Sequence, residues 1–227
     1  MIPLEGTWFA NPAVQKAMLP ALLETLQMVG LSGLATLIFG LPLGVLLYIT
    51  RPGGISENRP LNIALSTVIV NITRSFPYAI LMIALMPLTA LLVGTKIGPV
   101  AASVSLAIAA IPFFARLVET SLREVHSGKL DAAHAMGSTK LQTIVKVLLP
   151  EALPSLVASF TTTVVTIVGY SAMAGLIGGG GLGRLAYNYG FQRYQIDVMV
   201  MTVVLLVVLV QLVQWIGDRI SKAVDHR

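Results

Sequence analysis

The 227-residue sequence contains no cysteine, and only 11% of its residues are charged. Without cysteine, neither a disulfide framework nor a thiolate metal site is possible. Soluble domains typically have about 25% charged and about 45–50% apolar residues, whereas 56% of this chain is hydrophobic. This composition excludes an ordinary soluble domain and indicates a chain that lies mostly within a membrane.

Residue patterns typical of catalysis and cofactor binding are also scarce. The three histidines show no metal-ligand spacing, and no Ser-His-Asp arrangement is evident. Gly178 to Gly183 formally satisfies GxGxxG but follows an apolar span instead of a strand, so the context for dinucleotide binding is wrong. No P-loop motif is present either. We therefore expect no enzymatic activity, no metal, no cofactor and no ATP bound by this chain itself.

Long apolar runs dominate what the sequence does contain. A transmembrane helix needs about 20 predominantly apolar residues. Five stretches qualify, at residues 25–49, 75–93, 97–115, 153–177 and 196–216. The sequence predicts an all-α integral membrane protein in which residues 1–227 form a single transmembrane domain with five spans.

Basic residues predict the orientation, because Lys and Arg accumulate in cytoplasmic loops. Of the fifteen Lys and Arg residues, ten lie on one side of the predicted spans: Arg51, Arg59, Arg116, Arg123, Lys129, Lys140, Lys146, Arg219, Lys222 and Arg227. Four lie on the other side, and Arg74 is undecided. The pattern places the N-terminus outside and the C-terminus in the cytoplasm. Loop position therefore explains the net charge of +5 without a nucleic-acid partner.

The fourth span is the most polar of the five. Its Ser and Thr residues often only return hydrogen bonds to carbonyls of the same helix. The alternative is that this helix lines a translocation path, with Tyr170, Ser171 and Met173 at a gate or substrate cavity. Met is flexible and polarizable, which suits the wall of such a path.

Gly40 and Gly44 have the small-xxx-small spacing that permits close helix approach. Packing within one chain, with a bend at Pro42, and a seam between two copies are both compatible with this spacing.

The predicted cytoplasmic connection contains two short amphipathic pieces within residues 127–150. Asp131 is expected in the first turn of one helix, which should end at Gly137 in a left-handed conformation. Thr139 and Gln142 have the spacing of a capping box for a second helix, and Pro150 marks its end or the start of the next segment. Helices this short are marginal alone, so they must pack against the spans, the membrane surface or another protein.

This connection resembles the EAA loop of ABC importer permeases, in which Glu-Ala-Ala, three residues, Gly and nine residues precede Ile-x-Leu-Pro. Asp and Val replace the first Glu and the Ile. The resemblance implies that the loop forms coupling helices on an ATPase subunit, through Asp131, Ala132, Ala133, Gly137, Leu149 and Pro150.

Other stretches, among them RSFPYAILMIALMPLTALLVGTKIG and GYSAMAGLIGGGGLGRLAYNYGFQRYQ, look like the permease subunits of methionine importers. That resemblance implies a homodimer in the bacterial inner membrane, two ABC ATPase subunits that bind ATP, and a periplasmic or lipid-anchored substrate-binding protein. It also implies that the Tyr and Met of the fourth span belong to the substrate cavity. The alternatives are a permease of the same architecture for another small solute, an ion-driven secondary transporter, and a scaffold that anchors an ATPase.

Overall fold

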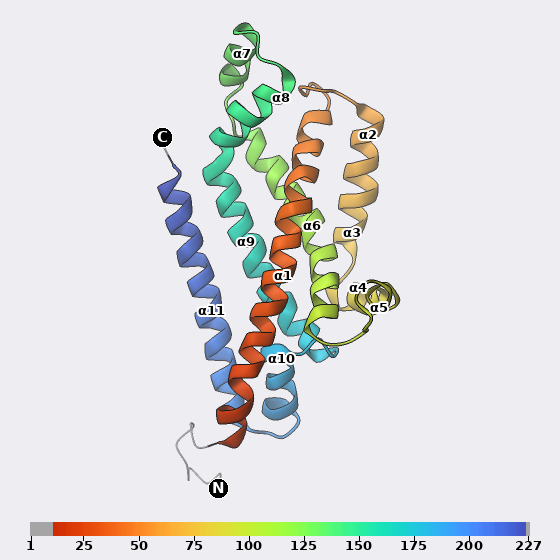
Figure 1. Ribbon diagram of the computed structural model, residues 1–227, viewed down its shortest axis with the longest axis vertical. Helices are drawn as coiled ribbons and strands as arrows, with labels where there is room; N and C mark the ends of the chain where they lie inside the picture. Colours follow the sequence, from red (N-terminus) through yellow and green to blue (C-terminus); the bar gives the residue numbers. More distant parts are fainter. Residues whose placement is uncertain (1–10, 226–227) are drawn as a thin grey trace. The chain divides into compact units, whose positions relative to one another are not determined.

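The computed structural model describes residues 11–225, which form helices and no strand (Figure 1). Four helices are long and apolar enough to cross a membrane: α1 (Pro12–Thr50), α6 (Pro99–Arg123), the helical run from Lys140 to Leu176 that includes α9 (Leu149–Leu176), and α11 (Ile196–Ala223). A fifth span exists if the helical segments on either side of a break at Phe76 and Pro77 together form one. The all-helical fold with four to five candidate spans confirms the predicted class.

Shorter elements connect the long helices. The π-helical segments η2, η3 and η4 each continue an α-helix without a break in the chain. In chain order the shorter elements are α2 (Arg59–Ile63), η2 (Ala64–Asn71), α3 (Ile72–Ser75), α4 (Tyr78–Ala84), α5 (Met86–Val93), α7 (Ser127–Ala135), α8 (Lys140–Thr143), η3 (Ile144–Leu148), α10 (Gly181–Leu185) and η4 (Ala186–Phe191).

Helix α1 begins thirteen residues before the predicted first span. Asn11 precedes it and accepts a hydrogen bond from the backbone N–H of Ala13 through its side chain, at 2.9 Å. Pro12 occupies the first helical position, where a missing N–H costs nothing. An apolar run measures the part of a helix suited to lipid, whereas the cap decides where the helix begins.

The predicted second span, residues 75–93, is not one helix. Phe76 is extended, with φ −79° and ψ 130°, and Pro77 likewise has ψ 130°. A proline ring disfavours the helical conformation of the residue before it, which explains why α3 ends at Ser75 and α4 starts at Tyr78. A second interruption at Leu85 precedes Pro87 and separates α4 from α5.

The chain divides into two compact units, and each long helix contributes residues to both. The first unit comprises the described residues up to Gly33, together with Pro77–Ala107 and Val164–Leu212. Its hydrophobic core joins the start of α1 to α10 and α11, through the buried residues Ala13, Val14, Met18, Ala21, Leu182, Leu185 and Val198.

The second unit comprises Leu34–Phe76, Ile108–Thr163 and the residues from Val213 onward. Its core joins α1, α6 and the start of α9, through Tyr48, Phe114, Val118, Leu122, Val125, Leu148, Ala152 and Leu156. A Cβ added to Gly44 would lie 2.5 Å from the Cβ of Val118, and one added to Gly40 would lie 2.9 Å from a ring carbon of Phe114. Both glycines therefore serve packing within the chain, where close approach supplies the van der Waals contact that holds membrane helices together.

Candidate functional site

Helix α7 opens the segment that the sequence singled out between the third and fourth predicted spans. His126 precedes α7, and its Nδ1 accepts a hydrogen bond from the N–H of Gly128 at 3.1 Å. Because the helix starts at Ser127, Asp131 is its fifth residue and not part of its first turn. The predicted interaction of Asp131 with the helix start is therefore wrong, since the structure uses the His126 side chain as the cap.

The predicted left-handed conformation of Gly137 at the end of the first helix is confirmed. Gly137 has φ +77°, a left-handed conformation that side chains with a Cβ rarely adopt. Neighbouring hydrogen bonds fix the turn: the N–H and the hydroxyl of Ser138 both donate to the carbonyl of Ala133, at 3.1 and 2.8 Å. All of these groups lie within a few residues of each other, so the sequence determines this turn locally.

The capping box that begins α8 is also confirmed. The N–H of Gln142 donates to the Thr139 hydroxyl at 3.3 Å, and the Gln142 side chain accepts from the N–H of Thr139 at 2.9 Å. Of the two alternatives for Pro150, an end of this helix is wrong, because the helical run continues through η3, whereas the start of the next segment agrees with α9 beginning at Leu149. A proline cannot donate to the carbonyl four residues earlier, and a local π-helical turn is one way in which a membrane helix satisfies the backbone groups that a proline frees.

The surface of residues 127–150 is unusually apolar for an exposed connection. Met136 is 81% exposed, Leu141 70% and Val145 53%, while Leu148 is fully buried against the core of the second unit. The apolar residues Leu141, Val145 and Leu148 of the second amphipathic piece are thus split between the outside and the core. Exposed apolar clusters of this kind mark protein or membrane contact sites. Met136 was missed by the sequence patterns because it lies beyond the end of α7.

The residues predicted for coupling share this surface only in part. Asp131, Ala132, Gly137 and Pro150 are exposed, Leu149 is half-buried, and Ala133 is buried at 2% exposure. Lys129 of α7 forms an ion pair with Glu151 in the first turn of α9. This ion pair links the two helices on either side of the exposed turn.

In α9, the three residues predicted for a path do not share a face. Ser171 is 1% exposed, and its hydroxyl donates to the carbonyl of Val168 at 2.7 Å. Met173 is 40% exposed and Tyr170 partly exposed; their spacing of three residues places both on one side of the helix. The structure places Tyr170 and Met173 on one side of α9 and turns Ser171 inward, where it returns a hydrogen bond to its own helix.

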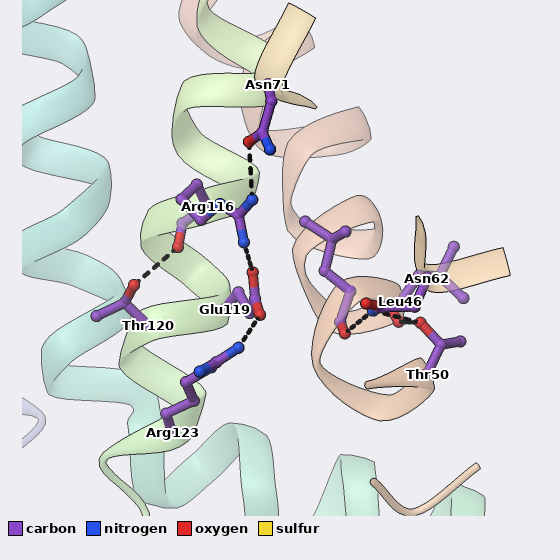
Figure 2. Close-up of polar contacts among 9 residues, drawn as sticks. Leu46, Thr50, Asn62, Asn71, Arg116, Glu119, Thr120 and Arg123 are labelled. Carbon is purple, nitrogen blue, oxygen red and sulfur yellow. Dashed lines mark hydrogen bonds and ion pairs between the residues drawn. The ribbon is translucent and has the colours of Figure 1, made fainter. Parts of the chain in front are cut away.

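A buried carboxylate in α6 was not anticipated. Glu119 is 3% exposed, and Figure 2 shows its two oxygens between two guanidinium groups: Arg116 at 2.6 Å and Arg123 at 2.5 Å. The second Nη of Arg116 donates to the side chain of Asn71 in η2 at 2.9 Å. Spacings of three and four residues place all three charges on one helical face, which is the pattern that would have revealed the cluster.

The glycine-rich turn after α9 is held by two side chains of α1. Glu24 accepts a hydrogen bond from the N–H of Gly181 at 2.6 Å and pairs with Arg184 at 3.3 Å. The hydroxyl of Thr25 accepts from the N–H of Leu182 at 2.9 Å. The two residues together cap the start of α10. Among residues 11–225, no group of three or more His, Cys, Asp or Glu side chains is arranged to hold a metal ion.

The sequence and the fold are similar to those of known transport proteins. The family described as the binding-protein-dependent transport system inner membrane component matches residues 40–226. The probable D-methionine transport system permease protein MetI of Vibrio cholerae is 54% identical over 220 residues, which cover 97% of this chain and 96% of that protein. The methionine import system permease protein MetP of Bacillus subtilis is 44% identical over 182 residues, 80% of this chain and 82% of that one. A solved chain of the inward-facing MetNI methionine ABC transporter, in its native crystal form, has a TM-score of 0.92 and 48% identity, covering 95% of this chain and 100% of its own length.

Proposed function

The chain belongs to the binding-protein-dependent inner-membrane transport components, and from this premise we propose that it is the permease subunit of an ATP-driven methionine importer. It is a transport subunit of a bacterial inner membrane and not an enzyme. Membership of this family decides between the ATP-driven and the ion-driven alternatives. In the proposal ATP binds to a separate ABC ATPase, and this chain carries no cofactor.

The exposed turn at Gly137 is the observation that carries the proposal. Helices α7 and α8 are joined there by a fixed left-handed residue, and Met136, Leu141 and Val145 leave an apolar surface uncovered. A short helical pair with such a surface suits a cleft in a partner protein. We therefore assign the coupling contact to residues 127–150, with Asp131, Ala132, Gly137 and Pro150 on the outside and Ala133 and Leu149 anchoring the pair to its own chain.

The orientation follows from the same assignment. If residues 127–150 face an ATPase, they lie in the cytoplasm, on the side that carries ten of the fifteen Lys and Arg residues. The N-terminus of α1 then lies outside and the C-terminus of α11 inside. The cluster of Arg116, Glu119 and Arg123 also falls on the cytoplasmic side, where its ion pairs make the last turns of α6 rigid.

The proposed translocation path runs along the face of α9 that carries Tyr170 and Met173. Gly169 and Met173 are exposed there, and a Cβ on Gly169 would meet no atom within 4 Å. Glycine in the middle of a helix costs about 1 kcal/mol relative to alanine, and no residue from 11 to 225 provides a packing reason for Gly169. A second copy of the chain and a passing substrate supply that reason, so we propose a homodimer with this face toward the axis. Ser171 lies behind the face and contributes rigidity.

The transport cycle in this proposal involves three kinds of subunit, which are the permease chain, the ATPase and the binding protein, and two ligands, methionine and ATP. A periplasmic or lipid-anchored binding protein delivers methionine to the outside-facing cavity of the homodimer. Closure of the two ATPase subunits on ATP moves the 127–150 segments and opens the cavity outward, and hydrolysis restores the inward-facing form. ATP shifts this equilibrium only because it binds one state more tightly than the other.

Purification of the tagged chain from its membrane, followed by reconstitution into liposomes, tests the function. The proposal expects one ATPase subunit per chain in the purified complex. Uptake of labelled methionine should require ATP on the side of the liposome membrane that carries the ATPase. It should also require the binding protein on the opposite side. Stable complexes that lack an ATPase, or methionine uptake that proceeds without ATP, would refute the proposal. Competition by other amino acids distinguishes methionine from another small solute.

A further inference from the structure

Tyr170 does not stand alone on its helix but is stacked on a second tyrosine. We propose that Tyr78 is a positioning residue that fixes the ring of Tyr170 for contact with an amino-acid substrate carrying a thioether. This inference rests on the proposed path along α9. Tyr78 itself touches no substrate in the proposal and acts through Tyr170.

The two rings form a close, parallel pair. Their centroids are 4.8 Å apart and their planes differ by 4°. Tyr78 is only 5% exposed, so packing fixes its ring, whereas Tyr170 is partly exposed. One face of Tyr170 is therefore covered by a ring that cannot move, which restricts the orientations available to Tyr170.

The hydroxyl group of Tyr78 is anchored at its far end. Ser105 is fully buried, and its hydroxyl donates its one proton to the carbonyl of Ala102 at 2.9 Å. The Ser105 oxygen, 3.3 Å from the Tyr78 hydroxyl, must then accept from Tyr78. The sulfur of Met82, at 3.7 Å, is a second, weaker acceptor for the same proton. Both ends of the Tyr78 side chain are thus fixed.

The break at Pro77 explains how Tyr78 reaches this position. Tyr78 is the first residue of α4, and the carbonyl of Pro77 accepts hydrogen bonds from Ile80 and Leu81, both at 3.0 Å. The fixed φ of proline and these two bonds determine the backbone at Tyr78. The interruption that the apolar run concealed therefore has a use, because it presents one aromatic side chain to α9.

Tyr170, unlike Tyr78, keeps its polar group available. Its hydroxyl forms no hydrogen bond with any residue from 11 to 225, and Met173 is exposed one turn further along the same face. The fixed Tyr170 ring, its hydroxyl and the thioether of Met173 on the same face suit an amino acid with a sulfur-containing side chain, since sulfur packs favourably against aromatic rings. Holding the ring in advance lowers the ordering cost of binding.

A double-mutant cycle in the complete reconstituted transporter tests the role of Tyr78. Replacing Tyr78→Leu should raise the KM for methionine about 2- to 10-fold, the range that corresponds to loss of an aromatic pair. In a Tyr170→Ala background the same replacement should change KM no further. Tyr78→Phe keeps the stack and loses only the hydroxyl anchor, so it should raise KM by less than Tyr78→Leu does. The matched control is Tyr187→Leu, which removes the stacked pair of Tyr187 and Phe191 and should leave KM unchanged.

The absence of native cysteine allows the path itself to be tested separately. With Met173→Cys, methionine should slow the reaction of the single introduced thiol with a maleimide. Lack of protection would refute the path along α9. If methionine protects the thiol but Tyr78→Leu changes KM equally in the presence and absence of Tyr170, the path stands and the positioning role of Tyr78 is refuted. An unchanged KM in Tyr78→Leu would also refute the positioning role alone. If Tyr78→Leu fails to assemble, Tyr78→Trp keeps a stacking surface and must retain a KM within about 2-fold.

Discussion

Two glycine turns of this chain are held in opposite ways. At Gly180 and Gly181, which have φ of +88° and +73°, an added Cβ would lie 2.7 Å from a Glu24 oxygen and 2.6 Å from the Thr25 hydroxyl. At Gly137, with φ +77°, an added Cβ would meet nothing within 4 Å. The first turn is enclosed by residues more than 150 positions away in the sequence. The second is fixed only by its own neighbours and is otherwise open.

The two turns therefore have different roles. Enclosure by Glu24 and Thr25 makes the 178–181 turn part of the internal structure of its unit, so its glycines are needed for folding. The open turn at Gly137 adds nothing to the core around it, while the helices on each side expose apolar side chains. The left-handed backbone at Gly137 therefore serves chiefly to position these side chains for contact with a partner protein. Changes at the first turn should reduce stability, and changes at the second should reduce partner binding and coupling.

The largest expected effect is at Gly181. Gly181→Ala introduces a Cβ in a left-handed conformation, in contact with Thr25 and Met28. Strain and overpacking together should lower the free energy of unfolding by about 3 kcal/mol. Thermal unfolding of the detergent-purified chain measures this loss. A stability equal to that of the unmodified chain would show that the turn is not enclosed as described.

The next effect concerns the residue that encloses the turn. Glu24→Ala removes the acceptor for the N–H of Gly181 and the ion-pair partner of Arg184. A half-buried N–H without a partner should cost about 1–2 kcal/mol of stability. Glu57→Ala is the control, because that carboxylate pairs with Arg59 on an exposed loop. Equal losses in the two variants would contradict the distinction between enclosed and open sites.

At the open turn, substitutions should affect the partner instead of the fold. Leu141→Glu places a charge on a side chain that is 70% exposed. The melting temperature of the isolated chain should stay unchanged, while its affinity for the ATPase should fall about 10-fold, as expected for loss of one buried leucine. Tyr194→Glu, at an 85% exposed position in the other unit, should leave that affinity unaltered. Destabilisation of the isolated chain by Leu141→Glu would show that this surface is not free.

A third turn, at Gly53, is held by a carboxylate, so its contribution to stability should depend on pH. The expected effect is smaller than those at the other two turns. The N–H of Gly53 donates to Glu57, and together with the Arg59 side chain this lowers the pKa of Glu57. A lowered pKa means that the ionised group stabilises the folded loop at neutral pH, and that this contribution disappears as the pH falls through the lowered pKa. Comparison of acid unfolding for the unmodified chain and Glu57→Gln should show a slightly weaker pH dependence in the variant. The turn at Gly137, held by neutral hydroxyl and amide groups, should contribute no such dependence.

Local features were predictable from the sequence, and those that depend on distant residues were not. Gly137, Thr139 and Gln142 interact within a few positions, so their spacing was sufficient. The helix break at Pro77 was missed because an apolar run does not distinguish one helix from two. The burial of Ser171 and Glu119 depends on which neighbouring helices cover them, which periodicity alone cannot state. The role of Glu24 is not visible in the sequence, because its partners lie at 181 and 184.

If the Gly137 turn couples the permease to the ATPase, its substitution should change the number of methionine molecules transported per ATP hydrolysed. Gly137→Val places a β-branched residue at φ +77°, and Gly94→Val does the same at φ +75° in the other unit, also with open space around the new Cβ. Both variants carry similar backbone strain, of about 1–3 kcal/mol. We expect Gly137→Val to lower transport per ATP about 10-fold or more, because strain of this size shifts the conformational equilibrium of the segment that contacts the ATPase. Gly94→Val should leave the ratio unchanged. An unchanged ratio in Gly137→Val, or an equal fall in both variants, would contradict the assignment of coupling to this turn.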